Sequence, residues 1–228
     1  HRVKLAPSLI RGDILNLERV FRELEASGAD CVHIDLMDGH FAPTLGFPVE
    51  LVKVVKDKFR IPLDIHLLVE EPGKFADLMP LEATDRVSLH IEAVEASKLQ
   101  QTIRVFRHSG AQVGLGLKLD TPLGLLTPWL NQVDTVLLLN IPPGAYGVAS
   151  GPTAFQRVQE LKALQKSRFP KLEIEIDGGI NQKTVATFAR LGADILVCGS
   201  IVFHHQGVED SVLELRDLLE KERTKLYG

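Results

Sequence analysis

The sequence contains few of the residues that mark secreted, membrane-spanning or nucleic-acid-binding proteins. Its 228 residues include two cysteines, one tryptophan and two tyrosines, and its formal net charge is -4. Cys31 and Cys198 lie in apolar runs without CxxC spacing, which predicts buried thiols in a reducing, cytoplasmic setting. The absence of a basic block argues against nucleic acid as a partner. No segment approaches the roughly 20 apolar residues that a membrane span requires.

What the sequence does have is an alternation of short apolar runs with longer amphipathic segments. This order is typical of an α/β fold with a parallel sheet. Eight strands are expected, at "VKLAPSL", "CVHIDL", "PLDIHLL", "RVSLHIE", "QVGLGLKL", "DTVLLLN", "LEIEIDG" and "DILVCGS". Helices are expected at residues 15–27, about 47–58, 72–81, 95–109, 122–131, 153–167, 181–191 and 208–225.

The eight pairs of elements favour a single (β/α)8 TIM barrel that spans residues 1–228 as one domain. Gly28, Gly110 and Gly192 follow expected helix ends, where glycine takes the left-handed conformation at little cost. A doubly wound open sheet is the structural alternative, but the first strand is not followed by its GxGxxG fingerprint. In a barrel, the chemistry is expected at the carboxyl ends of the strands.

Polar residues recur on one face near the ends of three strands. Side chains alternate across a strand, so His33, Asp35 and Met37 share a face, as do Asp64 with His66 and Glu175 with Asp177. A buried carboxylate is costly unless it is paired or binds metal. We therefore expect one divalent metal ion (Zn²⁺, Mn²⁺, Fe²⁺ or Co²⁺, less readily Mg²⁺), with these ligands: His33, Asp35, His66 and Asp177.

A plainer interpretation stays open at each of these positions. A histidine on an apolar face is often a hydrogen-bonded core residue, and an aspartate at a strand end often forms a turn or caps a helix. We expect Asp64 and His90 to orient the ligands rather than to bind the metal.

Glycine-rich turns follow the seventh and eighth strands. "DGGI" (177–180) and "GS" (199–200) each precede an expected helix, and such turns with helix N-termini bind phosphate in barrels. Ordinary turn chemistry is the alternative. Two carboxylates beside a metal and a phosphate anchor would suit inversion of a carbon next to a ketone through an enediolate, although metal-assisted hydrolysis uses similar ligands.

The motifs along the chain resemble those of a known family. "APSL" (6–9), "HIDLMDGHF" (33–41), "DIHLLVEEP" (64–72), "LHIEA" (89–93), "EIDGGI" (175–180) and "VCGSIVF" (197–203) are similar, in order, to motifs of the ribulose-phosphate 3-epimerase family. The resemblance implies an isomerase of the pentose phosphate pathway that converts D-ribulose 5-phosphate to D-xylulose 5-phosphate. It also implies a homo-oligomer with a small-molecule ketose phosphate as its partner.

The resemblance also assigns roles to individual residues. It implies that the four expected metal ligands are the family's ligands and that Asp35 and Asp177 are its acid/base pair. The substrate contacts that it implies are Ser8, Met37, His66, Gly144, Gly147, Gly178, Gly179, Gly199 and Ser200. For Met37, simple filling of the core is the alternative.

Several positions depart from the family's pattern. Leu68 and Leu139 stand where the family has methionine, and the loop "PPGAYGV" (142–148) replaces "NPGFGGQ", with Tyr146 in place of a glycine. Lys118 stands near an asparagine of the family and points either toward the substrate or to solvent. These departures keep two alternatives open: an epimerase for another ketose phosphate, such as allulose 6-phosphate, and a non-catalytic sugar-phosphate-binding homologue.

Overall fold

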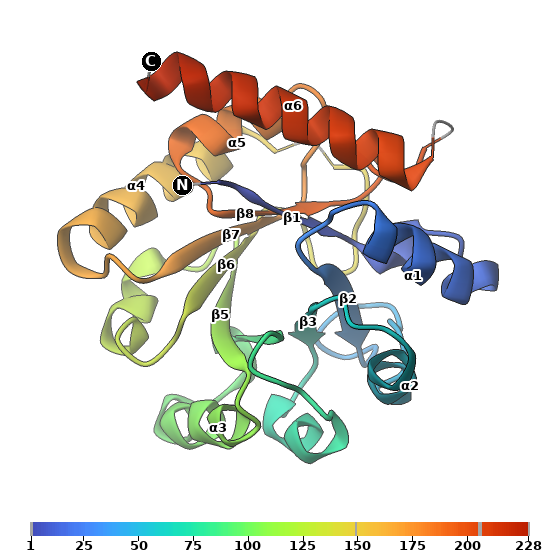
Figure 1. Cartoon of the computed structure of the whole chain (residues 1–228). Helices are drawn as coiled ribbons and strands as arrows, with labels where there is room; N and C mark the ends of the chain where they lie inside the picture. The colour runs from blue at the N-terminus through green and yellow to red at the C-terminus, as the bar shows by residue number, and fades with distance from the viewer. Residues whose placement is uncertain (1, 149, 205–206, 228) are drawn as a thin grey trace.

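The protein forms an eight-stranded parallel sheet with helices outside it, in a computed structural model that describes residues 2–148, 150–204 and 207–227 (Figure 1). All eight predicted strands are confirmed, in the sheet order β1-β8-β7-β6-β5-β4-β3-β2. They are β1 (Lys4–Pro7), β2 (Val32–Met37), β3 (Leu63–Leu68), β4 (Arg86–His90), β5 (Gln112–Lys118), β6 (Thr135–Leu139), β7 (Glu173–Asp177) and β8 (Ile195–Cys198).

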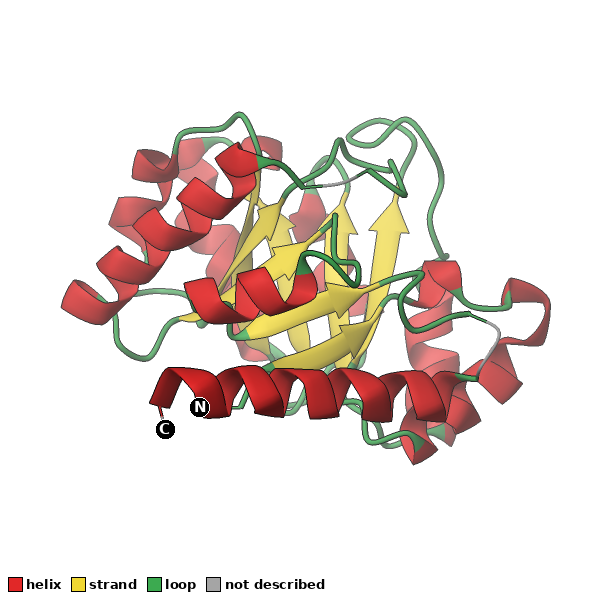
Figure 2. Cartoon of the chain, turned by 90° about the horizontal axis from the view of Figure 1, so that it is seen from above, coloured by secondary structure: helices red, strands yellow, loops and turns green. Residues whose placement is uncertain are grey.

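Six α-helices in the described residues surround the sheet, as Figure 2 shows with the strands in yellow inside the red helices. They are α1 (Leu17–Ala26), α2 (Glu50–Lys58), α3 (Ala96–His108), α4 (Pro152–Arg168), α5 (Val185–Leu191) and α6 (Val208–Tyr227). Gly28, Gly110 and Gly192 have φ angles of 77°, 86° and 102°, so the left-handed conformation predicted at these helix ends is confirmed. None of the described helices has the length and apolar character that crossing a bilayer demands.

Two of the expected helices are 3-10 segments instead of α-helices. The prediction of α-helix is wrong for residues 72–81 and 122–131, where the structure has η3 (Pro72–Leu78) and η5 (Leu123–Trp129). η3 begins with a Pro-Gly pair, and η5 contains Pro128, which has no N–H to donate to the preceding turn. Shorter 3-10 turns are η1 (Leu9–Arg11), η2 (Ile14–Asn16) and η4 (Ile91–Ala93).

The two edges of the sheet, β1 and β2, meet and nearly close the barrel. Ser8, just after β1, forms an isolated parallel bridge with His33 on β2. Nearer the amino ends of the two strands, Leu5 N–H donates to Asp30 Oδ2 at 2.7 Å, and Asp30 N–H donates to Leu5 O at 3.1 Å. The parallel bridge places Ser8 directly beside His33, two residues before Asp35 on β2.

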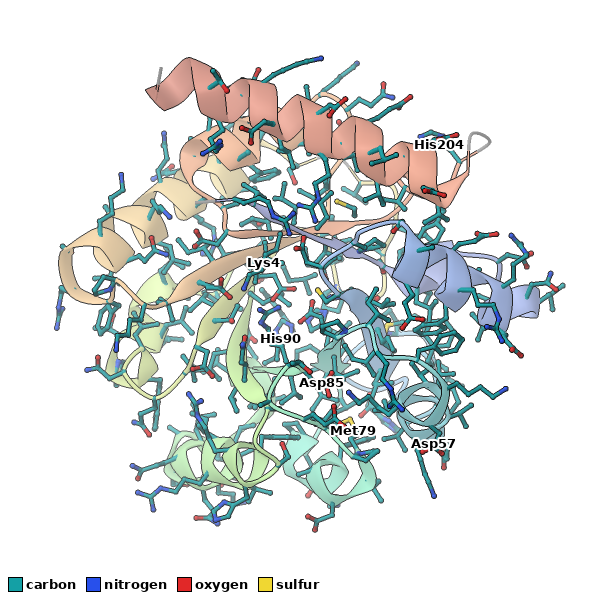
Figure 3. All side chains as sticks on the ribbon, viewed as in Figure 1. Lys4, Asp57, Met79, Asp85, His90 and His204 are labelled. Atoms are coloured by element: carbon teal, nitrogen blue, oxygen red, sulfur yellow. The ribbon has the colours of Figure 1, made fainter. Side chains whose placement is uncertain are left out.

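The protein has an apolar layer outside the barrel and a partly polar interior. Phe21, Phe106 and Phe188 are among the large side chains that are fully buried in the core shared by strands and helices. Inside the barrel, His90 lies near the centre of the ring of strands, whereas Asp57 lies outside on α2 (Figure 3). A smaller apolar cluster consists of Met37, Ala42, Leu68, Leu137 and Leu139. Both cysteines are buried free thiols, as predicted.

Candidate active site

Four side chains from β2, β3 and β7 converge in the interior of the barrel. His33 and Asp35 come from β2, His66 is the register partner of Asp35 on β3, and Asp177 ends β7. One potential ligand atom from each of these side chains lies within 4.8 Å of the others. The period of two along a strand brings His33 and Asp35 to one face, and the parallel register of β2 with β3 adds His66.

His66 Nδ1 lies between the two carboxylates of this cluster. It is 3.2 Å from Asp35 Oδ1 and 3.1 Å from Asp177 Oδ2. His33 Nε2 is 3.3 Å from Asp35 Oδ1 and 3.7 Å from Asp177 Oδ2. The Ser8 hydroxyl donates to Asp35 Oδ2 at 3.4 Å, so the other oxygen of that carboxylate is also engaged.

Partners behind each imidazole determine which nitrogen faces the cluster. His33 Nδ1 lies 2.7 Å from Asp64 Oδ2, so an N–H at Nδ1 donates to this carboxylate and leaves a lone pair on Nε2. His66 Nε2 lies 2.9 Å from His90 Nε2, and His90 Nδ1 lies 3.0 Å from Glu92 Oε2. In the matching tautomers, Glu92 accepts from His90, His90 accepts from His66, and His66 keeps its lone pair on Nδ1.

The residues of the cluster fit a divalent cation. His33 Nε2 is fully buried and makes no hydrogen bond within the described part of the chain, although two carboxylates lie close to it. Two imidazole nitrogens and two carboxylates are the donor set that zinc, manganese, iron and cobalt take in proteins. A cation among them would satisfy the buried nitrogen and balance the two negative charges.

The directions in which the pKa values of the histidines shift show that the cluster favours positive charge. Burial lowers the pKa of His33, but the charges of Asp35 and Asp64 outweigh it and raise this pKa well above its usual value. Burial likewise opposes protonation of His66, yet hydrogen bonds to Asp177 and Asp35 raise its pKa. Burial raises the pKa of Asp35, and the charge of His33 reverses this, so that its pKa falls below the usual range. Asp35 is therefore ionised.

A buried ionic network lies behind His33, toward the amino ends of the strands. Asp64 Oδ1 is 3.5 Å from the Arg86 guanidinium, which also contacts Glu173 at 3.2 Å and donates to Thr135 at 3.0 Å. Burial and the charge of Asp64 raise the pKa of Glu175 well above its usual value, which favours its protonated form. Asp64 is the ionised member of the pair, because His33 and Arg86 outweigh the effect of its burial on its pKa.

A cavity of about 190 Å³ opens above the carboxylates at the carboxyl ends of the strands. Asp35 and Asp177 line it, whereas His33 and His66 are fully buried and do not. Apolar lining comes from Met37, Leu68 and Leu139. The other lining residues that the sequence predicted are Ser8, Gly144, Gly147, Gly178, Gly179, Gly199 and Ser200.

Short turns separate the two glycine segments from the helices that follow them, and α6 begins at residue 208 as predicted. After Gly199 and Ser200 the chain forms a turn, with Val202 N–H donating to Gly199 O at 3.0 Å, and α6 begins at Val208. α5 begins at Val185, behind a turn in which the Thr184 hydroxyl donates to Gly179 O at 2.6 Å. The two glycine turns therefore lie between the strand ends and the helices, and a contribution of the helix N-termini to an anion site stays a prediction.

Three residues at the mouth were missed or left open by the sequence. Arg11 lines the cavity; its only signal in the sequence is a cation two residues after the end of the "APSL" motif. Tyr146 also lines the cavity, and burial together with Asp35 and Asp177 raises its pKa to about 12. Lys118 does not line it, because its Nζ lies 4.2 Å from the centre of the Phe41 ring.

Comparisons with known proteins identify related sequences over most of the chain. The sequence profile of the Ribulose-phosphate 3 epimerase family matches residues 4–203. The chain is 33% identical over 215 residues to the ribulose-phosphate 3-epimerase of Bacillus subtilis, covering 94% of this chain and 98% of the relative. It is 33% identical over 223 residues to that of Schizosaccharomyces pombe, covering 96% and 95%.

Solved structures share the fold at low sequence identity. A crystal structure of KGPDC from Streptococcus mutans has a TM-score of 0.73 at 11% identity, covering 99% of this chain and 99% of that one. Orotidine 5'-monophosphate decarboxylase from Sulfolobus solfataricus has a TM-score of 0.68 at 9% identity, covering 97% of this chain and 100% of that one. At these identities the likeness extends to the barrel alone.

Proposed function

Because the chain belongs to the ribulose-phosphate 3-epimerase family and is therefore a ketose-phosphate epimerase, we propose that it interconverts D-ribulose 5-phosphate and D-xylulose 5-phosphate. The observation that carries the proposal is the pair of carboxylates, Asp35 and Asp177, at the floor of one cavity. They come from β2 and β7, which are separated in the sheet by β1 and β8. Two bases on different sides of a pocket suit a reaction that inverts one carbon.

In the proposed mechanism, one carboxylate removes the proton from C3 and the other carboxyl group delivers a proton to the opposite face. Removal of the proton leaves an enediolate, whose negative charge spreads over the oxygens at C2 and C3. After one turnover the two carboxyl groups have exchanged protonation states, and proton exchange with solvent or the reverse reaction restores them. The low pKa of Asp35 keeps this group ionised, which is the form that a base must have.

His33, Asp35, His66 and Asp177 would hold one divalent metal ion. When bound, the ion supplies Lewis-acid stabilisation of negative charge on the substrate oxygens. The chain's own residues prepare the site, because Asp64 and His90 fix the tautomers of His33 and His66. Ser8 orients Asp35, and the side chains of Met37, Leu68 and Leu139 exclude water from the floor of the cavity.

Exchange of hydrogen at C3 tests the reaction directly. The metal-loaded protein should incorporate deuterium from heavy water at C3 of D-ribulose 5-phosphate and produce D-xylulose 5-phosphate. Mass spectrometry and NMR of the recovered sugar would measure both. Turnover without incorporation would contradict the two-carboxylate mechanism, and the absence of both would contradict the proposed function.

A second substrate is favoured by one feature of the cavity. Tyr146 and Val148 line it from a loop that departs from the family's sequence pattern. An epimerase for a longer ketose phosphate, such as D-allulose 6-phosphate, would use the same carboxylates. Comparing kcat/KM for the two sugars decides between them, because the larger value identifies the better-bound transition state. The homo-oligomeric state stays a prediction that light scattering would test.

A further inference from the structure

One charged side chain in the cavity has no part in the proposed proton transfers. The cavity lining includes three charged residues, and Asp35 and Asp177 are both acidic. Arg11 is the only cation among the lining residues that the structure describes. A phosphorylated sugar carries close to two negative charges at neutral pH, so the two carboxylates alone would repel it. A cation in the same cavity offsets that repulsion.

The backbone and two neighbours position the Arg11 side chain over the glycine turn after β8. Arg11 ends η1, and its N–H donates to Ser8 O at 3.1 Å, so its backbone is tied to the residue that contacts Asp35. Its Cγ passes close to Gly199, where an added Cβ would approach it to 3.2 Å. Its Cζ lies 5.7 Å from the centre of the Tyr146 ring, in a cation–π arrangement.

The Arg11 guanidinium is available for a ligand. Within the described ranges, its side chain forms neither a hydrogen bond nor a salt bridge with the protein. Arg22 provides a contrast, because it too lies over an aromatic ring, at 5.8 Å from Phe59, but it is paired with Glu18 at 2.7 Å. A planar guanidinium presents several N–H donors that match the oxygens of a phosphate group.

We propose that Arg11 binds the phosphate group of the substrate, that Tyr146 positions its guanidinium, and that this pair selects phosphorylated over unphosphorylated ketoses. The inference rests on the proposed function for the identity of the sugar. Gly178, Gly179 and Gly199 also line the cavity, and their backbone N–H groups are donors of no net charge. Arg11 adds the full charge that distinguishes a phosphate from a hydroxyl group.

Binding of inorganic phosphate tests the role of Arg11 without any turnover. In Arg11→Met, which keeps the length of the side chain and removes its charge, the Kd for phosphate should rise roughly ten- to hundredfold. The Kd of Arg11→Lys should lie between those of the parent and Arg11→Met, because lysine keeps the charge but lacks the planar guanidinium group. The matched control is Arg22→Met, which changes net charge equally at a second ring-stacked arginine and should leave the Kd unchanged. Isothermal titration at fixed ionic strength measures all four proteins.

The Tyr146 contact is tested by a double-mutant cycle. Tyr146→Leu removes the ring face and should raise the Kd for phosphate roughly two- to fivefold when Arg11 is present. The same change should have no effect in the Arg11→Met background, because no cation remains to be positioned. Tyr146→Phe keeps the ring and should retain the parent's affinity for phosphate. An equal effect of Tyr146→Leu in both backgrounds would refute the positioning role.

Kinetics with the sugar phosphate complete the test. Arg11→Met should raise KM for D-ribulose 5-phosphate by a factor similar to the change in Kd while kcat changes little, because the phosphate does not take part in bond breaking. If the Kd of Arg11→Met for phosphate lay within twofold of the parent's Kd, the proposal would be overturned, even if the enzyme were active. If the parent turned over no ketose phosphate, the proposed function would fail, and the phosphate titrations would still decide the role of Arg11.

Discussion

Replacing Asp64 with asparagine tests how the site holds its metal. Asp64 is fully buried and does not line the cavity, but its Oδ2 lies 2.7 Å from Nδ1 of His33. The carboxylate only accepts hydrogen bonds, so it keeps the proton on Nδ1 and the lone pair on Nε2. An asparagine amide can donate to Nδ1 instead, which would move the proton to Nε2 and block this nitrogen as a ligand.

The expected loss follows from the nature of this hydrogen bond. A hydrogen bond to a charged group contributes about 1.5–3 kcal/mol, which corresponds to about a 10- to 150-fold change in an equilibrium constant. Loss of an outer partner of a ligating histidine typically weakens metal binding about 10- to 100-fold. Arg86 also forms a salt bridge with Glu173 at 3.2 Å. Because this ion pair remains in the variant, the protein should fold.

Metal affinity and activity are to be measured together. Competition with a chelator should show a metal Kd raised about 10- to 100-fold for Asp64→Asn, and saturating metal should restore part of the activity. The control is Asp85→Asn, because Asp85 is also fully buried and ion-paired, with Lys56 Nζ at 2.9 Å, yet lies outside the metal cluster. It should lower stability and leave the metal Kd unchanged. An unchanged Kd in Asp64→Asn would refute the tautomer argument.

Three other changes have equally definite outcomes. Asp177→Asn should lower kcat by at least about 100-fold and abolish deuterium exchange at C3, with an unchanged circular dichroism spectrum; retained exchange would rule out the acid/base pair. Gly179→Ala should weaken phosphate binding and lower the melting temperature more than Gly147→Ala does. The two positions have φ angles of 73° and 72°, but only at Gly179 would a Cβ collide, reaching Ser150 Oγ at 2.0 Å, so equal effects would contradict the steric argument. Burial raises the pKa of Glu92 and its bonds to His90 and Thr121 outweigh this, so its pKa falls from 4.5 to about 2. The folded-state pKa is depressed, so Glu92 stabilises the protein above about pH 4.5 and loses this effect as the pH falls toward 2. The shift corresponds to at most about 3 kcal/mol, which solvent screening reduces to about 1–2 kcal/mol. The free energies of unfolding of Glu92→Gln and the parent, measured in urea, should therefore differ at pH 7 and become equal in acid. A difference that does not change with pH would contradict the assignment.

Much of the barrel was predictable because its signals are local. Each strand is a short apolar run, and the alternation of side chains along a strand is enough to put His33 and Asp35 on one face. Where local signals conflict, prediction was weaker. Residues 72–78 and 123–129 have helical patterning, but their prolines and glycines favour 3-10 turns.

The phosphate end of the cavity was only partly predictable. The glycines after β7 and β8 do line the cavity, and α6 begins at residue 208 as expected, but α5 begins at Val185 instead of residue 181. Turn geometry there depends on contacts such as the Thr184 hydroxyl on Gly179 O, which no periodic pattern in the sequence announces. Arg11 was not singled out, because a lone arginine in a loop has no distinctive spacing.

The sequence by itself determined the eight alternating units, the residues that face the interior and the chemical types available at the strand ends. These follow from the periods of strand and helix, which act over a few residues. The sequence predicted one metal cluster with Asp35 and Asp177, but only the tertiary structure decided that both line the same cavity, and that Arg11 meets Tyr146 over Gly199. Such meetings depend on closure of the barrel and on loop paths, because they join residues far apart in the chain through packing that no local pattern encodes.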